Sequence, residues 1–255
     1  MKNTKFYLQA AMLLLPAFLS AQNVIPEPTQ YRPAKGQFVL TAAETKAFEA
    51  QDVLPGRVVQ CVISGSTPMD ADEAYHLKIT PDSVFIQSAT ATGAFRGKET
   101  LKQLLRSGKG TAKACVINDA PRYAWRGFML DESRHFFGKK KVKQLLDIMA
   151  SLRLNVFHWH LTDEPGWRIE IKKYPLLTQI GAKGNWHDPD APATFYTQDD
   201  IKEIVAYAAA RHIMVVPEFD MPGHATAACR AYPELSGGGE GRWKDFTFHP
   251  CKEET

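Results

Sequence analysis

The sequence predicts an α/β protein in two parts, a small α+β domain over 22–120 and an α/β part over 121–255. Two observations support this prediction. Short strand-like runs, separated by proline, glycine, aspartate and serine, dominate the first part. In the second part, near-continuous apolar runs alternate with amphipathic helical stripes, a pattern typical of parallel strands covered on both faces. The alternation fits either an open doubly wound sheet or a (β/α)8 barrel.

In the first part, we expect a helix after the strands, because leucines recur at helical spacing in RGKETLKQLL. A linker is expected over 118–122, where Asn, Asp and Pro come together. No chemistry is visible in this part, so it is interpreted as a supporting domain. The strand-like runs cover 38–40, 58–63, 75–79 and 84–86.

In the second part, three strands are expected at 127–130, 155–161 and 212–219. Between the first two, residues 139–152 carry an apolar stripe at i, i+3, i+4, i+7 and i+10, which predicts an amphipathic helix. A second helix is expected to begin after Thr197, whose hydroxyl can cap it with Asp200 three residues on. Its stripe consists of Ile201, Ile204, Val205 and Ala208.

The composition is that of a globular protein, with 44% hydrophobic and 23% charged residues. The 31 basic and 28 acidic residues leave no electrostatic reason to expect a nucleic-acid partner. Residues 1–21 resemble a secretory signal peptide, with Lys2 and Lys5 before an apolar run too short to span a bilayer. We therefore expect an exported protein (periplasmic, cell-surface or extracellular) with no membrane span.

The chain has four cysteines, and export permits disulfides. The obvious pairings are Cys61 with Cys115 and Cys229 with Cys251, although four cysteines allow three pairings. Buried free thiols remain an equal alternative. No CxxC pair occurs, so a zinc ribbon or a thioredoxin-type site has no support.

Polar side chains gather directly after each apolar strand of the second part. In a barrel these strand ends meet on one face, where barrel enzymes build their sites. Because burying many charges in one crevice is costly, we expect them to serve a ligand. The groups are residues 131–135, then His158, His160, Asp163 and Glu164, then Glu218, Asp220 and His224.

Two features of the second part suggest ligand classes. Five tryptophans lie there, and aromatic faces stack on sugar rings while carboxylates and an arginine bind vicinal hydroxyls. His158 and His160 are two apart in a strand and share a face, which is also a metal-ligand spacing. The tryptophans are Trp125, Trp159, Trp167, Trp186 and Trp243.

Three runs carry a resemblance to a known family: RGFMLDESRHF, NVFHWHLTDEPGWRIEI and VVPEFDMPGHA. They resemble exo-β-N-acetylhexosaminidases of glycoside hydrolase family 20, whose usual forms are close to GxxxDxSRHF, NxxHxHLxDDQGWR and PExDMPGH. The similarity is dense across 126–225, and residues 22–120 resemble the family's non-catalytic N-terminal domain. The resemblance implies that 121–255 is the beginning of a (β/α)8 TIM-type barrel.

The resemblance also implies roles for individual residues. Arg134 resembles the arginine that binds hydroxyls of the terminal sugar. Asp163 and His224 match residues that support the catalytic acid. Glu218 and Asp220 match the substrate-binding PExD run.

The implied reaction removes a terminal β-linked N-acetylglucosamine or N-acetylgalactosamine from glycans, and which of the two is preferred stays open. The substrate's acetamido oxygen attacks the anomeric carbon, a Glu protonates the leaving oxygen and a neighbouring Asp orients the acetamido group. This differs from the two-carboxylate retaining scheme. No metal or cofactor is implied. Glu164 and Pro165 depart from the family's usual Asp and Gln.

The family's catalytic Asp–Glu pair lies in a run resembling HxGGDE, and the sequence contains no such run. The pairs at 131–132 and 163–164 align with other family positions and are interpreted as decoys. Residues 121–255 number 135, whereas a full barrel takes about 250. We therefore expect an incomplete barrel of three strand–helix units, a fragment inactive alone, with the acid and its partner beyond Thr255.

Two alternatives remain from other functional classes. One is a non-catalytic sugar-binding pseudoenzyme that keeps Arg134, Asp163 and Asp220. The other is a metal-dependent barrel hydrolase that uses His158 and His160.

Overall fold

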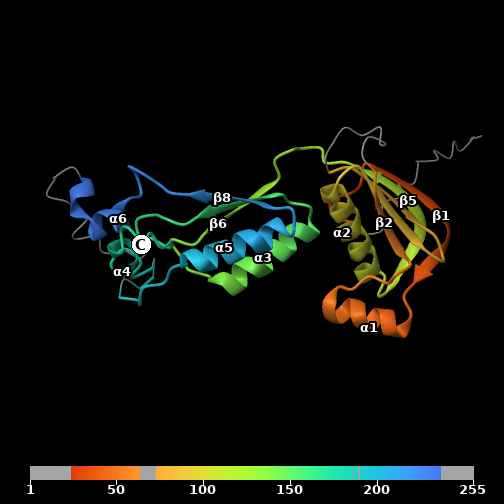
Figure 1. Ribbon diagram of the computed structural model, residues 1–255, viewed down its shortest axis with the longest axis horizontal. Coiled ribbons are helices and arrows are strands. Elements are labelled where there is room, and N and C mark those ends of the chain that lie inside the picture. Colours follow the sequence, from red (N-terminus) through yellow and green to blue (C-terminus); the bar gives the residue numbers. More distant parts are fainter. Residues whose placement is uncertain (1–23, 64–72, 186, 189, 237–255) are drawn as a thin grey trace, which may run out of the picture.

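The computed structural model describes residues 24–63, 73–185, 187, 188 and 190–236. These residues form two parts side by side along the long axis of the molecule (Figure 1). One contains a five-stranded sheet and the other a three-stranded sheet. The expected signal peptide over 1–21 lies outside the described residues, as do Trp186, Trp243 and Cys251.

The N-terminal sheet has the strand order β1-β5-β3-β4-β2, and all its pairings are antiparallel except β2 with β4. Both helices of this part share one core with the sheet, because α2 contributes three leucines and α1 contributes Phe48. The elements are β1 Gln30–Val39, α1 Ala42–Gln51, β2 Val58–Val62, β3 Tyr75–Ile79, β4 Val84–Ser88, α2 Ala91–Ser107 and β5 Thr111–Asp119.

Two strands and a helix of this part differ from the sequence prediction. The helix α1 was not predicted, since Phe48 is its one buried residue and no apolar stripe marks it. The strand β1 extends over ten residues although it contains a proline and Gly36 (φ +99°), and its register with β5 shifts between Pro33 and Gln37. The linker prediction over 118–122 is wrong at its start, because β5 continues through Asp119.

The second part contains a parallel sheet in the order β6-β7-β8, which confirms the predicted parallel strands. Figure 1 shows α3 and α5 together along this sheet, with α4 and α6 at its far end. The elements are β6 Gly127–Asp131, α3 Lys139–Ser151, β7 Val156–His160, α4 Leu176–Gln179, α5 Gln198–Ala209, β8 Met214–Glu218, α6 Thr226–Ala231 and the 3₁₀ helix η1 Pro233–Ser236.

The two long helices of this part form for the reasons that the sequence indicates. The predicted stripe of α3 buries Val142, Leu146 and Met149 in the core that α3 shares with β7 and α5. Thr197 caps α5 and receives a reciprocal bond from Asp200, so the predicted capping box is confirmed.

The three-stranded sheet is open at both edges within the described residues. The strand β7 has a neighbour on each side, whereas β6 and β8 have one neighbour each. Met129 and Met214, which lie on these edge strands, are 51% and 53% exposed. The described part of the chain is therefore mixed α/β with an unclosed barrel sheet.

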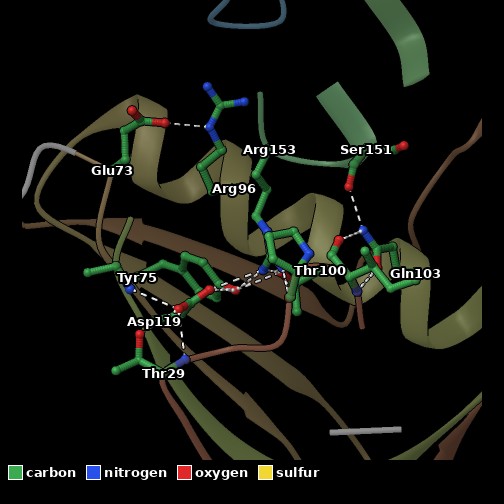
Figure 2. A network of polar contacts seen from close by, with 12 residues as sticks. Thr29, Glu73, Tyr75, Arg96, Thr100, Gln103, Asp119, Ser151 and Arg153 are labelled. Atoms are coloured by element: carbon green, nitrogen blue, oxygen red, sulfur yellow. Dashed lines mark hydrogen bonds and ion pairs between the residues drawn. The ribbon is translucent and has the colours of Figure 1, made fainter. Parts of the chain in front are cut away.

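A buried polar network joins the two parts (Figure 2). Arg153, which follows α3, is 6% exposed and donates from Nη1 to Tyr75 Oη (2.9 Å), Thr100 Oγ1 (2.9 Å) and Asp119 Oδ2 (3.1 Å). Its Nη2 donates to the carbonyl of Pro26. Arg153 therefore links the end of α3 to β3, α2 and β5 of the N-terminal part.

The disulfide prediction is wrong for one pair. Cys61 and Cys115 are free cysteines, because β4 and β3 separate their strands in the sheet and only Cys115 faces the core. Cys229 is also free, and its predicted partner lies outside the described residues. In the described part of the chain, no helix has the length and apolar character needed to cross a membrane.

Candidate active site

The carboxyl ends of the three parallel strands bring ionisable side chains to one level. Asp131 is the register partner of His160, and His160 is the register partner of Glu218. Each is the last residue of its strand. Parallel pairing therefore assembles this row, although the three residues are far apart in the sequence.

Arg134 lies beside this row and bridges two carboxylates. Its Nη1 is 2.7 Å from Asp131 Oδ2 and its Nη2 is 2.6 Å from Asp163 Oδ2. The backbone N–H groups of Ser133 and Arg134 both donate to Asp131 Oδ1 at 3.0 Å, which closes the turn after β6. The side chain of Arg134 remains 33% exposed, and each terminal nitrogen carries two N–H groups, so donors remain for a ligand.

Asp163 is the buried centre of the cluster, at 1% exposure. Besides Arg134, its Oδ2 lies 2.8 Å from His160 Nε2 and 3.2 Å from His224 Nδ1. The same His224 nitrogen lies 3.0 Å from Asp220 Oδ2. The sequence predicted Arg134, Asp163, Glu218, Asp220 and His224 as site residues, and the structure brings all five together with His160.

His160 bridges two carboxylates, because its Nδ1 is 2.9 Å from Glu218 Oε2 while its Nε2 faces Asp163. Burial opposes the imidazolium, but the bonds to Glu218 and Asp163 outweigh it and raise the pKa of His160. Burial likewise opposes the Glu218 carboxylate, and its bonds to His160 and His158 nevertheless lower the pKa of Glu218. The contacts with Glu218 and Asp163 therefore favour the charged form of the His160 ring against the burial that opposes it.

The histidine pair can be weighed as a metal site on this geometry. His158 Nε2 lies 2.5 Å from Glu218 Oε2, so both histidines face one carboxylate as their shared strand face predicts. His160, Asp163 and Asp220 place ligand atoms within 4.8 Å of one another. The guanidinium of Arg134 already contacts Asp163, however, and a cation at that position disfavours a second one.

The cluster suits a ligand rich in hydroxyl groups. It presents a forked donor, Arg134, beside carboxylates that can accept hydroxyl protons. The cluster contains one arginine, three histidines and the carboxylates Asp131, Asp163, Glu218 and Asp220. Each of these side chains except Asp163 and His160 is at least 28% exposed.

Two acidic pairs, at 131–132 and 163–164, were interpreted as decoys for the catalytic pair. In each pair the buried carboxylate, Glu132 or Asp163, is already occupied by hydrogen bonds or ion pairs within the protein. Glu132 is 0% exposed, and its two oxygens accept from Tyr196 Oη and from the N–H of Phe137, each at 2.7 Å. Asp163 Oδ2 is occupied by its contacts with Arg134, His160 and His224. Among the tryptophans, Trp159 and Trp167 are buried in the core, whereas Trp125 is 62% exposed.

Comparison with known proteins identifies the family. A profile of the glycosyl hydrolase family 20 catalytic domain matches residues 123–254, and one of domain 2 of the same family matches 49–120. The chain belongs to glycosyl hydrolase family 20. The first of these matches covers all the site residues described above.

Relatives of this family 20 chain include β-hexosaminidases. A β-hexosaminidase of Porphyromonas gingivalis is 34% identical over 89% of this chain, and one of Vibrio furnissii is 37% identical over 83%. These alignments cover 34% and 39% of the relatives, so the chain spans little more than a third of their length.

Solved structures show the same fold. The N-acetyl-β-hexosaminidase of Streptomyces plicatus, in complex with Thio-NAglucal, superposes with a TM-score of 0.74 at 35% identity, over 84% of this chain and 48% of its own. An exo-β-N-acetylglucosaminidase of Vibrio harveyi, in complex with N-acetylglucosamine, gives 0.73 at 31% identity, over 84% and 38%.

Two members of the cluster were assigned differently from the sequence. His160 was considered as a metal ligand, and Asp131 as part of a decoy pair. Both instead contact the predicted site residues directly. The signal was present in the sequence, because each closes an apolar strand, but their contacts depend on a register that no single run contains.

Proposed function

We propose that this chain supplies the sugar-binding half of a β-N-acetylhexosaminidase site, which takes terminal β-linked N-acetylglucosamine or N-acetylgalactosamine. Membership of family 20 and the β-hexosaminidase relatives support the reaction class. The observation that carries the proposal is the half-exposed Arg134 fork held between Asp131 and Asp163.

In this proposal Arg134 binds two hydroxyls of the terminal sugar. A planar guanidinium matches a pair of vicinal oxygens, and its two carboxylate partners hold the fork at one angle. Glu218 and Asp220, at 32% and 33% exposure, accept further hydroxyl protons. Asp163 and His224 support the catalytic acid, and their contact at 3.2 Å would hold the two side chains together for this role.

The proposed reaction is acetamido-assisted hydrolysis with retention. The acetamido oxygen of the substrate attacks the anomeric carbon, and a carboxylic acid protonates the leaving oxygen. Because the 255 residues contain no run resembling HxGGDE, we propose that the acid and its Asp partner are supplied by sequence that this chain does not include. The site residues described here then act in binding and support.

A second candidate is a sugar-binding protein without hydrolytic activity. The missing HxGGDE-like run favours it for the 255 residues on their own. Both candidates bind the sugar through the Arg134 cluster, but only the first hydrolyses it.

The experiment compares the gene product that contains these residues with the 255-residue chain. The substrate is a chromogenic β-N-acetylglucosaminide, and N-acetylglucosamine binding is measured in parallel. The hydrolase proposal expects turnover by the gene product and none by the chain, since a missing general acid costs about 10²–10⁴-fold. Sugar binding without turnover in both samples would favour the sugar-binding protein. Absence of sugar binding in both would reject either function.

Export is proposed separately, from the signal-like pattern of residues 1–21. Mass spectrometry of the mature N-terminus checks it. Cleavage after a residue close to Ala21 is the expected result, and an intact Met1 in the purified native protein would contradict export by this route.

A further inference from the structure

A fully buried carboxylate, Glu132, lies beneath the site and has no part in the proposed chemistry. It follows Asp131, the last residue of β6, and precedes the turn that carries Arg134. The family pattern GxxxDxSRHF leaves this position unspecified, so the resemblance assigns it no role. Burying an ionisable group costs free energy unless its contacts compensate. Those contacts therefore indicate what Glu132 does.

The carboxylate of Glu132 joins two segments that are distant in the sequence. Its Oε1 accepts from Tyr196 Oη at 2.7 Å, and its Oε2 accepts from the N–H of Phe137 at 2.7 Å. Tyr196 is itself fixed, at 1% exposure, with its ring 4.7 Å from that of Phe136 and 4.8 Å from that of Trp159. Glu132 thus links the far end of the 133–137 turn to Tyr196, a buried and closely packed side chain.

The bond to Phe137 also lies at the beginning of α3. Gly138 is the N-cap of that helix, at φ +80°, and it has no side chain to cap the free N–H groups. A carboxylate near the positive end of a helix is favourable. Glu132 therefore acts where the turn becomes the helix.

A second anchor holds the near end of the turn. Arg168, which is 0% exposed, donates from Nη2 to the carbonyl of Ser133 at 2.9 Å. The hydroxyl of Ser133 donates to the carbonyl of Gly166 at 2.7 Å. Arg134 consequently lies between an anchored Ser133 and an anchored Phe137.

We propose that Glu132 is a positioning residue for sugar binding, which holds the 133–137 turn so that the Arg134 guanidinium faces Asp131 and Asp163. Its effect on the sugar rests on the proposed function, whereas its effect on the turn does not. Burial raises the pKa of Glu132 despite its hydrogen bonds, so burying this carboxyl group costs free energy that its contacts only partly offset. A positioning role accounts for its presence.

The test uses the gene product that contains this chain, with Glu132→Ala and Glu132→Gln. Glutamine can accept from the N–H of Phe137 and donate to Tyr196 Oη, so it keeps both links, whereas alanine loses both. Glu99→Ala is the matched control, because Glu99 is also buried (5% exposed) and bonds Lys102 Nζ at 2.8 Å in the other part. Hydrogen exchange of the peptide spanning 132–138 reports on the turn, and kcat/KM for a chromogenic β-N-acetylglucosaminide reports on Arg134.

We expect Glu132→Ala to speed exchange in this peptide and to lower kcat/KM about tenfold, with Glu132→Gln within about threefold of the unmodified protein. In an Arg134→Ala background, Glu132→Ala should have less than about a twofold effect, because it acts through Arg134. If Glu132→Ala does not fold, Tyr196→Phe removes one link and should give a smaller loss with the same dependence on Arg134.

Unchanged exchange and kcat/KM in Glu132→Ala would overturn the proposal. The proposal would also be overturned if Glu132→Gln or Glu99→Ala lowered kcat/KM as much as Glu132→Ala does. The same holds if Glu132→Ala lowered kcat/KM about tenfold in the Arg134→Ala background. A gene product without hydrolysis or sugar binding would instead reject the proposed function, and hydrogen exchange would still decide whether Glu132 holds the turn.

Discussion

Two arginine–carboxylate clusters in this molecule have similar contacts and different surroundings. Arg153 at the junction of the two parts is 6% exposed, and its described contacts are one carboxylate, two hydroxyls and a carbonyl. Arg134 at the strand ends is 33% exposed and lies among four carboxylates and three histidines. The first cluster is matched in charge and closed to solvent, and the second is acid-rich and open.

The exposure and pairing of the guanidinium therefore separate a structural arginine from a binding one. A buried, fully paired guanidinium has donors committed to the protein, so removing it leaves an unpaired buried charge. A half-exposed guanidinium among surplus acceptors is oriented by the protein and keeps donors for a ligand.

The largest effect is expected for stability, from Arg153→Met. The substitution removes the cationic partner of the buried Asp119 carboxylate and leaves it only the neutral donors of Thr29, Tyr75 and Ala120. Breaking a buried ion pair in this way should cost about 3–5 kcal/mol in the free energy of unfolding. Denaturant unfolding measures it. Lys202→Met is the control, because the Lys202–Asp199 pair is 73% and 87% exposed and should contribute about 0–1 kcal/mol. A loss below about 1 kcal/mol for Arg153→Met would remove the contrast between the clusters.

Arg134→Ala should lower kcat/KM of the gene product about 10²-fold or more, in a protein that still folds because the buried Asp163 keeps its contacts with His160 and His224. Two charge-assisted hydrogen bonds, at roughly 1.5–3 kcal/mol each, account for this size. Lysine should restore little, since it lacks the planar fork. A variant that melts earlier but keeps normal kinetics per folded molecule would mean that Arg134 merely pairs with Asp131.

A smaller effect is expected in the pH dependence of stability. The folded pKa of His160 is raised, so its stabilisation is complete below its ordinary value of 6.5 and is lost as the pH rises through the folded pKa. The folded pKa of Glu218 is lowered, so its stabilisation is present above 4.5 and is lost as the pH falls through the folded value.

The measurement is the free energy of unfolding between about pH 4 and pH 8, for the unmodified protein and for His160→Gln. The variant should lose the decline on the alkaline side. Superimposable profiles would show that His160 is not held as an imidazolium between Glu218 and Asp163.

Chelation should have no effect. Hydrolysis by the gene product should persist in EDTA, because the proposed chemistry uses carboxylates and the substrate's acetamido group. Loss of activity in EDTA, with recovery on added zinc, would favour the metal-dependent alternative at His158 and His160.

The elements that the sequence predicted well are those whose signal is local. The stripe of α3 and the capping box at Thr197 depend on neighbouring residues, and both are found as expected. The strands β1 and β5 depend on pairing across about eighty residues of chain, with a register shift between Pro33 and Gln37. Only the end of β1 was therefore predicted, and β5 was not predicted.

The site shows the same division. Arg134, Asp163 and His224 were found because they lie in motifs that can be read in the sequence. The contacts of His160 with both Asp163 and Glu218 require the parallel register of β7 with β8, and the role of Glu132 requires knowledge of its burial. Neither property is encoded in a short run of residues.

The proposed function places the sugar at the open cluster around Arg134 and not at the closed cluster around Arg153. A crystal structure of the gene product with N-acetylglucosamine would show which of the two binds the sugar. We expect two sugar hydroxyls within hydrogen-bonding distance of the Arg134 guanidinium, about 2.7–3.2 Å, and an undisturbed Arg153 network. A sugar bound elsewhere, or an Arg134 that contacts only Asp131 and Asp163 in the complex, would contradict the claim.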